Sequence, residues 1–235
     1  MASRERSTRD PLPRGDDKVR AVRAMFDAIA PRYDLVNRIM TFRMDVGWRR
    51  KTVAALRLPP RSVVVDIACG TGDLCRELAG EGLSPVGVDL SFGMLSAART
   101  SAPLVQGDAL QLPFADETVD GATCGFALRN FVALEPFFTS LARALRPGGR
   151  IALLEVAEPA NPVLRWGHGI YFGKVVPRIG ALLSDGSAYR YLPRSVEYLP
   201  ETDVMLDMIR TAGFTDVSRT VLSGGIAQLI TSRRA

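Results

Sequence analysis

Five short apolar runs, most of them rich in β-branched residues, alternate with helical segments between residues 62 and 157. Apolar strands that are separated by helices are typical of a parallel sheet covered by helices on both faces. Right-handed crossovers place the carboxyl ends of such strands along one edge of the sheet, where ligands bind. The runs are SVVVDIA (62–68), PVGVDL (85–90), PLVQGDA (103–109), TVDGATCGFA (118–127) and GRIALLEVA (149–157).

The last part of the chain carries two further strand-like runs, DVSRTVL (216–222) and GIAQLIT (225–231). They are joined at Ser223-Gly224-Gly225, and glycines between two such runs are a hairpin signal. The whole pattern therefore predicts an α/β fold. We expect a doubly wound, Rossmann-like, mostly parallel seven-stranded sheet that ends in an antiparallel C-terminal hairpin.

The chain has 235 residues, enough for one substantial core, and its composition marks no domain boundary after the first residues. We expect a disordered basic leader over residues 1–18 and a single domain over residues 19–235. Residues 159–200 interrupt the alternation with two helical pieces rich in Pro, Gly, Tyr and Arg. This insert is either a helical cap beside a substrate or an irregular connection.

Positive charge is concentrated at the two ends of the chain. Residues 1–23 carry seven Arg or Lys against four Asp or Glu, Arg233 and Arg234 add two charges, and residues 24–232 are balanced. A nucleic-acid-binding domain normally carries a basic face on the fold itself, so we expect no nucleic-acid partner. The basic ends favour solubility or a weak, transient attraction to an anionic membrane surface.

Cysteine, histidine and hydropathy patterns indicate the compartment. No apolar run reaches the roughly 18 residues of a membrane helix, and the first residues lack the apolar stretch of a secretory signal. Three cysteines without a CxxC pair and one histidine, His168, predict no disulfide framework and no metal site. We expect a cytoplasmic protein with reduced thiols, with peripheral contact at the inner face of the membrane and a homodimer left open.

The strongest chemical signal is VVVDIACGTGDL, in which a strand ends near Asp66 and Gly70-Thr71-Gly72 open a helix. Glycines at such a turn permit positive φ and let a ligand approach the backbone closely. A dinucleotide fingerprint has a third glycine, where this chain has Cys75.

Two further predicted strands end in acidic residues, Asp89 followed by Leu90, and Asp108. A carboxylate at Asp89 can accept two hydrogen bonds from a ribose diol, and Asp108 is placed for an adenine amino group. A nucleoside site without the third glycine favours S-adenosylmethionine over a nicotinamide dinucleotide, with Asp66 toward its cationic end. Each aspartate taken singly is also explained as a turn or a helix cap.

Several longer motifs are more specific than the fold. They are FDAIAPRYDLVN (26–37) with Trp48 beyond it, DIACGTGDL, FALRN, the RPGGR turn, and PRIGALLSDGSAYRYLPRSVEYLP (177–200). In these the chain resembles the ubiquinone/menaquinone biosynthesis C-methyltransferase family, from about Val22 to Ile226. The resemblance implies a class I methyltransferase that uses S-adenosylmethionine to methylate the ring of a polyprenyl quinol, such as demethylmenaquinol.

By position, the resemblance places the family's cofactor contacts on Thr71, Asp89, Asp108, Ala109 and Gly125. The substrate side departs from the family's pattern. Asp45 stands where many members have histidine before the motif tryptophan, EVAEP (155–159) stands where they have EFSKP, and QLI (228–230) replaces a C-terminal histidine and lysine. The cofactor contacts are thus retained, and the choice between a naphthoquinol and a benzoquinol is left open.

The stretch GFALRN ends the fourth predicted strand with Arg129 and Asn130. A quinol ring carbon becomes a good nucleophile when a neighbouring hydroxyl loses its proton, which requires a base or a fixed positive charge. We expect Arg129 to stabilise the phenolate or polarise a water molecule, and Asn130 to orient the substrate. The alternative is that Arg129 pairs with a structural acid.

Tyrosines and apolar residues are the candidates for the substrate side. Tyr33 and Asp34 are expected in an N-terminal flap over the cofactor, with helix capping by Asp34 as the alternative. Tyr171, Tyr189 and Tyr191 are expected to line the quinol pocket. Ordinary packing explains such tyrosines equally well. The same alternatives apply to candidates for an isoprenoid channel, which are Val163, Ile170, Val175 and Leu182.

Two functions from other classes remain open. One is a small-molecule methyltransferase of secondary metabolism on the same scaffold, and the other is a non-catalytic binding or assembly protein with this fold.

Overall fold

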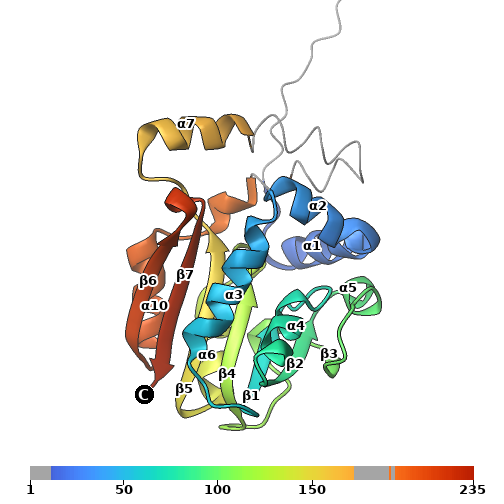
Figure 1. Ribbon diagram of the computed structural model, residues 1–235, viewed down its shortest axis with the longest axis vertical. Coiled ribbons are helices and arrows are strands. Elements are labelled where there is room, and N and C mark those ends of the chain that lie inside the picture. Colours follow the sequence, from blue (N-terminus) through green and yellow to red (C-terminus); the bar gives the residue numbers. More distant parts are fainter. Residues whose placement is uncertain (1–11, 172–190, 192–193) are drawn as a thin grey trace, which may run out of the picture.

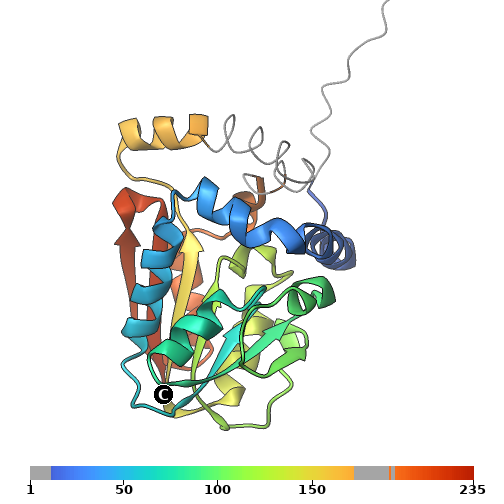
Figure 2. The ribbon, with the colours of Figure 1, turned by 45° about the vertical axis from the view of Figure 1, so that its right-hand side comes forward.

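The computed structural model describes residues 12–171, 191 and 194–235. Over these residues the chain forms one seven-stranded sheet with helices on both faces and further helices above the carboxyl ends of the parallel strands (Figures 1 and 2). The N-terminal helices α1 and α2 lie above this end of the sheet, and helix α7 lies beyond it in both views.

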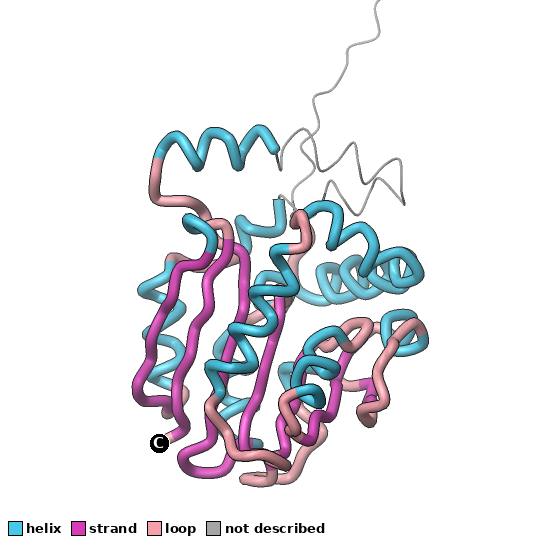
Figure 3. Tube along the Cα trace, viewed as in Figure 1, coloured by secondary structure: helices cyan, strands magenta, loops and turns pink. Residues whose placement is uncertain are grey.

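The strands lie in the order β3-β2-β1-β4-β5-β7-β6 (Figure 3). Strands β1 to β5 pair in parallel, whereas β7 is antiparallel to both β5 and β6. The predicted doubly wound sheet and its terminal hairpin are therefore confirmed. The strands are β1 (Val63–Ile67), β2 (Ser84–Asp89), β3 (Leu104–Gln106), β4 (Val119–Gly125), β5 (Leu145–Val156), β6 (Phe214–Leu222) and β7 (Ala227–Arg234).

Helices follow the strands and also precede the first one. None of those in the described part of the chain is long and apolar enough to cross a membrane. The α-helices are α1 (Gly15–Ile29), α2 (Tyr33–Met40), α3 (Met44–Leu56), α4 (Asp73–Gly80), α5 (Phe92–Ser96), α6 (Leu134–Ala144), α7 (Pro162–Ile170) and α10 (Thr202–Thr211). Short 3₁₀ turns are η1 (Ala30–Arg32), η2 (Ala109–Gln111), η3 (Leu128–Asn130), η5 (Val196–Tyr198) and η6 (Ser223–Gly225).

Alternation along β1 divides the core between the two faces of the sheet. Val64 packs in a cluster with Leu56 of α3 and Leu78 of α4. Its neighbour Val65 packs on the opposite face, in the cluster that contains Phe137 of α6 and residues of α10. Both residues are completely buried, which explains why β1 is a continuous apolar run rather than an alternating one.

A third, smaller core joins the N-terminal helices to the sheet. Ile29 of α1, Val36 and Met40 of α2, and Met94 of α5 are buried together. Because α5 follows β2 directly, this cluster holds α1 and α2 over the carboxyl ends of the strands, where the sequence predicts the site.

Residues 15–18 are helical, although the sequence predicts them within the leader. Helix α1 begins at Gly15, and Lys18 is only 3% exposed. The Lys18 Nζ donates to the carbonyl of Phe131 at 2.6 Å and lies 3.6 Å from the ring centroid of Tyr198. Arg234 at the other end of the chain belongs to β7, where its guanidinium donates to backbone carbonyls.

Three of the strand boundaries that differ from the predicted ones do so for local reasons. Strand β3 stops at Gln106 because Asp108 caps the η2 turn. Strand β4 ends at Gly125 because Phe126 turns the chain with a φ of 59°. Strand β5 begins early, because Leu145 already pairs with β4.

We expect Phe137→Ala to lower the free energy of unfolding by about 3–5 kcal/mol, because it removes a fully buried ring from the larger core. Urea denaturation followed by circular dichroism measures this. Thr139→Ala on the exposed side of the same helix is the control, expected to change stability by less than about 0.5 kcal/mol. Equal effects of the two substitutions would contradict the assignment of the α6 face.

Candidate functional site

The turn after β1 presents backbone to a cavity at the carboxyl edge of the sheet. Gly70 has a φ of 55°, a conformation that favours glycine, and it lines this first cavity. A Cβ added at Gly70 would have no heavy atom within 4 Å, so it would occupy open space beside the turn. The amide of Gly70 donates to Asp89 Oδ2 at 2.8 Å, which fixes the turn against the end of β2.

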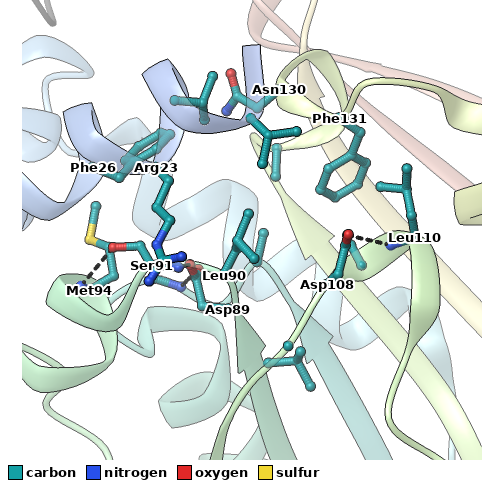
Figure 4. Close-up of a pocket in the computed structure, with 18 of the residues that line it drawn as sticks. Arg23, Phe26, Asp89, Leu90, Ser91, Met94, Asp108, Leu110, Asn130 and Phe131 are labelled. Atoms are coloured by element: carbon teal, nitrogen blue, oxygen red, sulfur yellow. Dashed lines mark hydrogen bonds between the residues drawn. The ribbon is translucent and has the colours of Figure 1, made fainter. Parts of the chain in front are cut away.

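Asp89 and Asp108 lie on two sides of the same cavity (Figure 4). Asp89 Oδ1 accepts from the amide of Ser91 at 2.8 Å, and Asp108 Oδ1 accepts from the amide of Leu110 at 2.9 Å. Burial raises the pKa of Asp89. Each carboxylate oxygen has two lone pairs, so both residues can cap their turns and still accept hydrogen bonds from a ligand.

The first cavity is largely apolar between these carboxylates, with one wall supplied by α1. Figure 4 shows Arg23 extending from α1 into the cavity toward Ser91 and Asp89. Six further residues that the sequence predicts in the site also line the first cavity: Gly70, Leu90, Ala109, Gly125, Asn130 and Tyr33. A site of this kind suits a nucleoside: apolar walls for a base and carboxylates for its hydroxyl and amino groups.

Three residues predicted to touch the cofactor do not line this cavity. Asp66 is buried below it, where it accepts from Thr123 Oγ1 at 2.8 Å. Thr71 donates its hydroxyl to Asp34 of α2. Gly72 is the N-cap of α4 and has a φ of 83°. A Cβ at this position would lie 2.7 Å from the side chain of Thr100, so this glycine is required by packing.

Asp66 is a strongly perturbed carboxyl group of this region. Its complete burial raises its pKa to about 7, while hydrogen bonds from Thr123 and Cys75 oppose the shift. Asp66 therefore titrates near neutral pH beneath the glycine turn. A cation bound in the cavity would favour its ionised form.

The end of β4 separates the first cavity from a second one. Gly125 lines the first cavity, and a Cβ at this position would lie 2.9 Å from Leu74 Cδ1. Phe126 and Tyr33 line both cavities, so the two meet at these rings. The second cavity is mostly apolar and lies between α2, α3, α7 and the end of β5.

Arg129 lines the second cavity and is paired with a buried acid. Its Nη1 bonds to Glu155 Oε1 and to the carbonyl of Phe126, and its Nε donates to Ser195 Oγ at 3.1 Å. Glu155 also accepts from the amides of Arg129 and Val156. The alternative that Arg129 pairs with a structural acid is thus observed, and Arg129 nevertheless lines the cavity.

The other predicted residues divide between the two cavities. Asn130 faces the first cavity and accepts from Tyr191 Oη at 3.3 Å. Tyr171 lines the second cavity, where its hydroxyl donates to the carbonyl of Met40 at 2.9 Å. Tyr189, like Val175 and Leu182, lies outside the described residues.

Sequence reasoning missed the polar wall of the second cavity. Asp45, which replaces a histidine of the family pattern, is buried and paired with Arg49, whose second partner is Asp73 at 3.1 Å. Trp48 donates its indole N–H to Ser223 Oγ at 2.9 Å. The i, i+4 spacing of Asp45 and Arg49 signals the first pair, whereas no sequence signal joins Trp48 to a residue 175 positions away.

Sequence reasoning also missed the attachments of α1. Asp27 Oδ1 accepts from Ser91 Oγ at 2.5 Å and from the amide of Gly93 at 2.9 Å, at the start of α5. Lys18 fixes the other end of α1 to Phe131. Two contacts about two and a half helical turns apart thus hold α1 as a wall of the first cavity.

Comparison with known proteins agrees with this geometry. A model of the ubiE/COQ5 methyltransferase family matches residues 14–233. The chain belongs to this family. It is an S-adenosylmethionine-dependent methyltransferase with the class I methyltransferase fold.

Relatives with assigned names cover nearly the whole chain. A demethylmenaquinone methyltransferase of Roseiflexus castenholzii is 43% identical over 229 residues, covering 94% of this chain and 96% of the relative. The ubiquinone/menaquinone biosynthesis C-methyltransferase UbiE of Syntrophotalea carbinolica is 41% identical, with coverage of 91% and 94%.

Solved structures share the fold at low sequence identity. A possible histamine N-methyltransferase of Thermotoga maritima aligns with a TM-score of 0.64 and 18% identity over 91% of this chain and 99% of that one. A phosphoethanolamine N-methyltransferase of Haemonchus contortus, solved with S-adenosyl-L-methionine, aligns with a TM-score of 0.57 and 15% identity, covering 78% of this chain and 52% of that one.

We expect Gly93→Ala to weaken S-adenosylmethionine binding about tenfold, which is about 1.4 kcal/mol. Its Cβ would lie 2.8 Å from the backbone Cα of Asp27, so α1 must move away from α5. Isothermal titration calorimetry measures the affinity. Gly80→Ala, where a Cβ meets nothing within 4 Å, is the matched control and should bind like the wild type. Equal affinities of the two variants would show that α1 is not a required wall of the cavity.

We expect S-adenosylmethionine affinity to rise between pH 6 and pH 8. The raised pKa of Asp66, about 7, means that its carboxyl is largely protonated at pH 6 and ionised at pH 8. The bound cation favours the ionised form, so binding releases protons in this interval. Titrations across this pH range measure the effect, and S-adenosylhomocysteine, which lacks the sulfonium charge, should show less of it. Retention of the full pH dependence in Asp66→Asn would contradict the assignment to Asp66.

Proposed function

We propose that this enzyme methylates a ring carbon of a polyprenyl quinol, converting demethylmenaquinol to menaquinol. The observation that carries this proposal is the meeting of two cavities at Tyr33 and Phe126: the first cavity, lined by Asp89 and Asp108, and a larger apolar cavity. The printed names of the full-length relatives support the same reaction. A ubiquinone precursor is the second candidate substrate, because one relative is named for both quinones.

The cofactor is held by residues of the first cavity. Asp89 accepts the ribose hydroxyls, Leu90 and Ala109 contact the adenine, and Asp108 accepts from its amino group. Asp66, with Gly70, Thr71 and Gly72, shapes the cationic end from below. Gly125 leaves room at the end of β4. Bound S-adenosylmethionine supplies an electrophilic methyl group on a sulfonium.

The protein's part in the chemistry is to position the ring and to stabilise a phenolate. A quinol ring carbon is nucleophilic when an adjacent hydroxyl is deprotonated, and the oxidised quinone is not. Arg129 presents a permanent positive charge to the second cavity. Within the described part of the chain its guanidinium donates through Nε and Nη1, so we assign Nη2 to the substrate oxygen or to a bound water.

Asn130 and Tyr33 complete the proposed substrate contacts at the junction. Asn130 is anchored by Tyr191, and Tyr33 lines both cavities, so each can fix the ring relative to the methyl group. Alignment of this kind supplies roughly 7–11 kcal/mol in well-oriented reactions. Tyr171 lines the apolar part of the second cavity, where we place the start of the isoprenoid tail.

The wider biological setting is proposed on the same grounds. We place the enzyme in the cytoplasm, in transient contact with the inner face of the membrane that holds its substrate, and we leave open its assembly as a homodimer. The predicted basic leader, residues 1–18, overlaps helix α1 from Gly15 onward. We propose a single methyltransferase domain for the rest of the chain, with residues 159–200 as a cap beside the substrate.

Purified enzyme should transfer a labelled methyl group from S-adenosylmethionine to a short-chain demethylmenaquinol under reducing conditions. Mass spectrometry of the extracted quinone measures the product, and the oxidised quinone should give none. Failure to methylate demethylmenaquinol or a benzoquinol of any chain length would contradict the proposed function. Such a failure would favour a different small-molecule substrate.

Arg129→Lys should lower turnover by about two orders of magnitude, while S-adenosylmethionine affinity stays within about twofold. Lysine keeps a charge beside Glu155, whereas alanine would leave a buried carboxylate unpaired and destabilise the fold. Arg143→Lys on α6, which lines neither cavity and pairs with Asp116, is the control. Unchanged turnover in Arg129→Lys would show that Arg129 has only a structural role. A loss of S-adenosylmethionine affinity would show instead that Arg129 acts on the cofactor in the first cavity.

A further inference from the structure

Exposed apolar side chains gather around the second cavity. Of the eleven large apolar side chains that are exposed in the described part of the chain, seven lie on α2, on the turn after it, or on α7. Those most exposed are Val163 at 75%, and Phe42 and Trp166 at 71% each. The full set is Leu35, Ile39, Phe42, Val163, Leu164, Trp166 and Ile170, which we call the α2–α7 patch.

The two halves of the patch are in contact with one another. The rings of Phe42 and Tyr171 lie 5.5 Å apart, and the Tyr171 hydroxyl donates to the last residue of α2. Figures 1 and 2 show α2 and α7 at the same end of the molecule, beyond the carboxyl edge of the sheet. The patch therefore belongs to one end of the protein.

The second cavity opens within this patch. Phe42, Val163 and Leu164 belong to the patch and also line the cavity. An apolar molecule that enters between α2 and α7 thus passes from exposed apolar side chains directly to the cavity that Arg129 lines. Water-exposed apolar residues of this number on a single face are typical of a binding surface.

The charge around the patch is positive. Residues 35–44 and 159–171 contain Arg38, Arg43 and Arg165 and no Asp or Glu. Of the acids that flank these ranges, Asp34 accepts from Thr71, Asp45 pairs with Arg49, and Glu158 is exposed, so three arginines stand against one exposed acid. Aromatic and aliphatic side chains flanked by arginines are the pattern of surfaces that lie in the interface of an anionic bilayer, where the arginines reach the headgroups.

We propose that the α2–α7 patch docks on an anionic lipid bilayer and receives the substrate from it. This inference rests on the proposed function, since a polyprenyl quinol is itself held in the bilayer. The enzyme would lie with α2 and α7 against the headgroups and with its second cavity open to the lipid. Docking at this end leaves the opposite end of the sheet in water.

Vesicle sedimentation of the full-length protein without substrate tests the surface. Wild-type protein should bind vesicles that contain phosphatidylglycerol more strongly than vesicles of phosphatidylcholine alone. Trp166→Ser should reduce binding about tenfold, because it removes a large apolar side chain that is 71% exposed and lines neither cavity. Val204→Ser, an exposed apolar residue on α10 outside the patch, should bind like the wild type.

A second variant tests the charge. Arg43→Asn should reduce binding to the anionic vesicles and leave binding to phosphatidylcholine vesicles unchanged. Asparagine suits this position because Arg43 has a φ of 62°. Thermal unfolding of each variant excludes a loss of fold as the cause.

Two outcomes would overturn the proposal: wild-type protein that does not bind anionic vesicles, or Trp166→Ser protein that binds them as tightly as the wild type. The second outcome would assign membrane binding to the basic N-terminal residues instead. Methylation of a short-chain quinol in solution separates this failure from failure of the proposed function. Trp166→Ser should retain that activity and lose activity on a long-chain quinol held in vesicles.

Discussion

The buried pair of Arg129 and Glu155 is the interaction on which the arrangement of the two cavities depends. Placing two charges away from water is costly unless further hydrogen bonds satisfy them. Here the backbone supplies those bonds: Glu155 accepts from two amides, and Arg129 donates to the carbonyl of Phe126. The pair thereby joins the end of β4 to the end of β5 and fixes Phe126, the ring at which the cavities meet.

This pairing also changes how the GFALRN motif is understood. From the sequence, Arg129 as a catalytic cation and Arg129 as a structural partner were alternatives. In the structure Glu155 and Ser195 bind two nitrogens of the guanidinium, Nη1 and Nε, and the side chain still lines the second cavity. Anchoring is what a catalytic cation requires, because a preorganised charge stabilises a developing phenolate without reorganisation.

The sheet and the first cavity were predictable because their signals are local. Continuous apolar runs mark buried parallel strands, and Asp89 and Asp108 follow their strands directly, so the topology alone brings them to one edge. The N-terminal wall was not predictable in the same way. The helical spacing of α1 shows that one face is buried, but neither Lys18 nor Asp27 reveals partners that lie more than 60 residues away. The sequence places Asp66 at the carboxyl edge of the sheet, where the structure also has it. Its depth below the glycine turn was not predictable, because that depth depends on its contact with Thr123 on the neighbouring strand.

A structure with S-adenosylhomocysteine and a soluble menaquinol analogue tests the central claim most directly. We expect the nucleoside to occupy the cavity of Asp89 and Asp108. The cofactor sulfur should point between Tyr33 and Phe126, with the quinol ring beside Arg129 in the second cavity. A cofactor sulfur directed away from that junction, or a ring bound outside the second cavity, would contradict it.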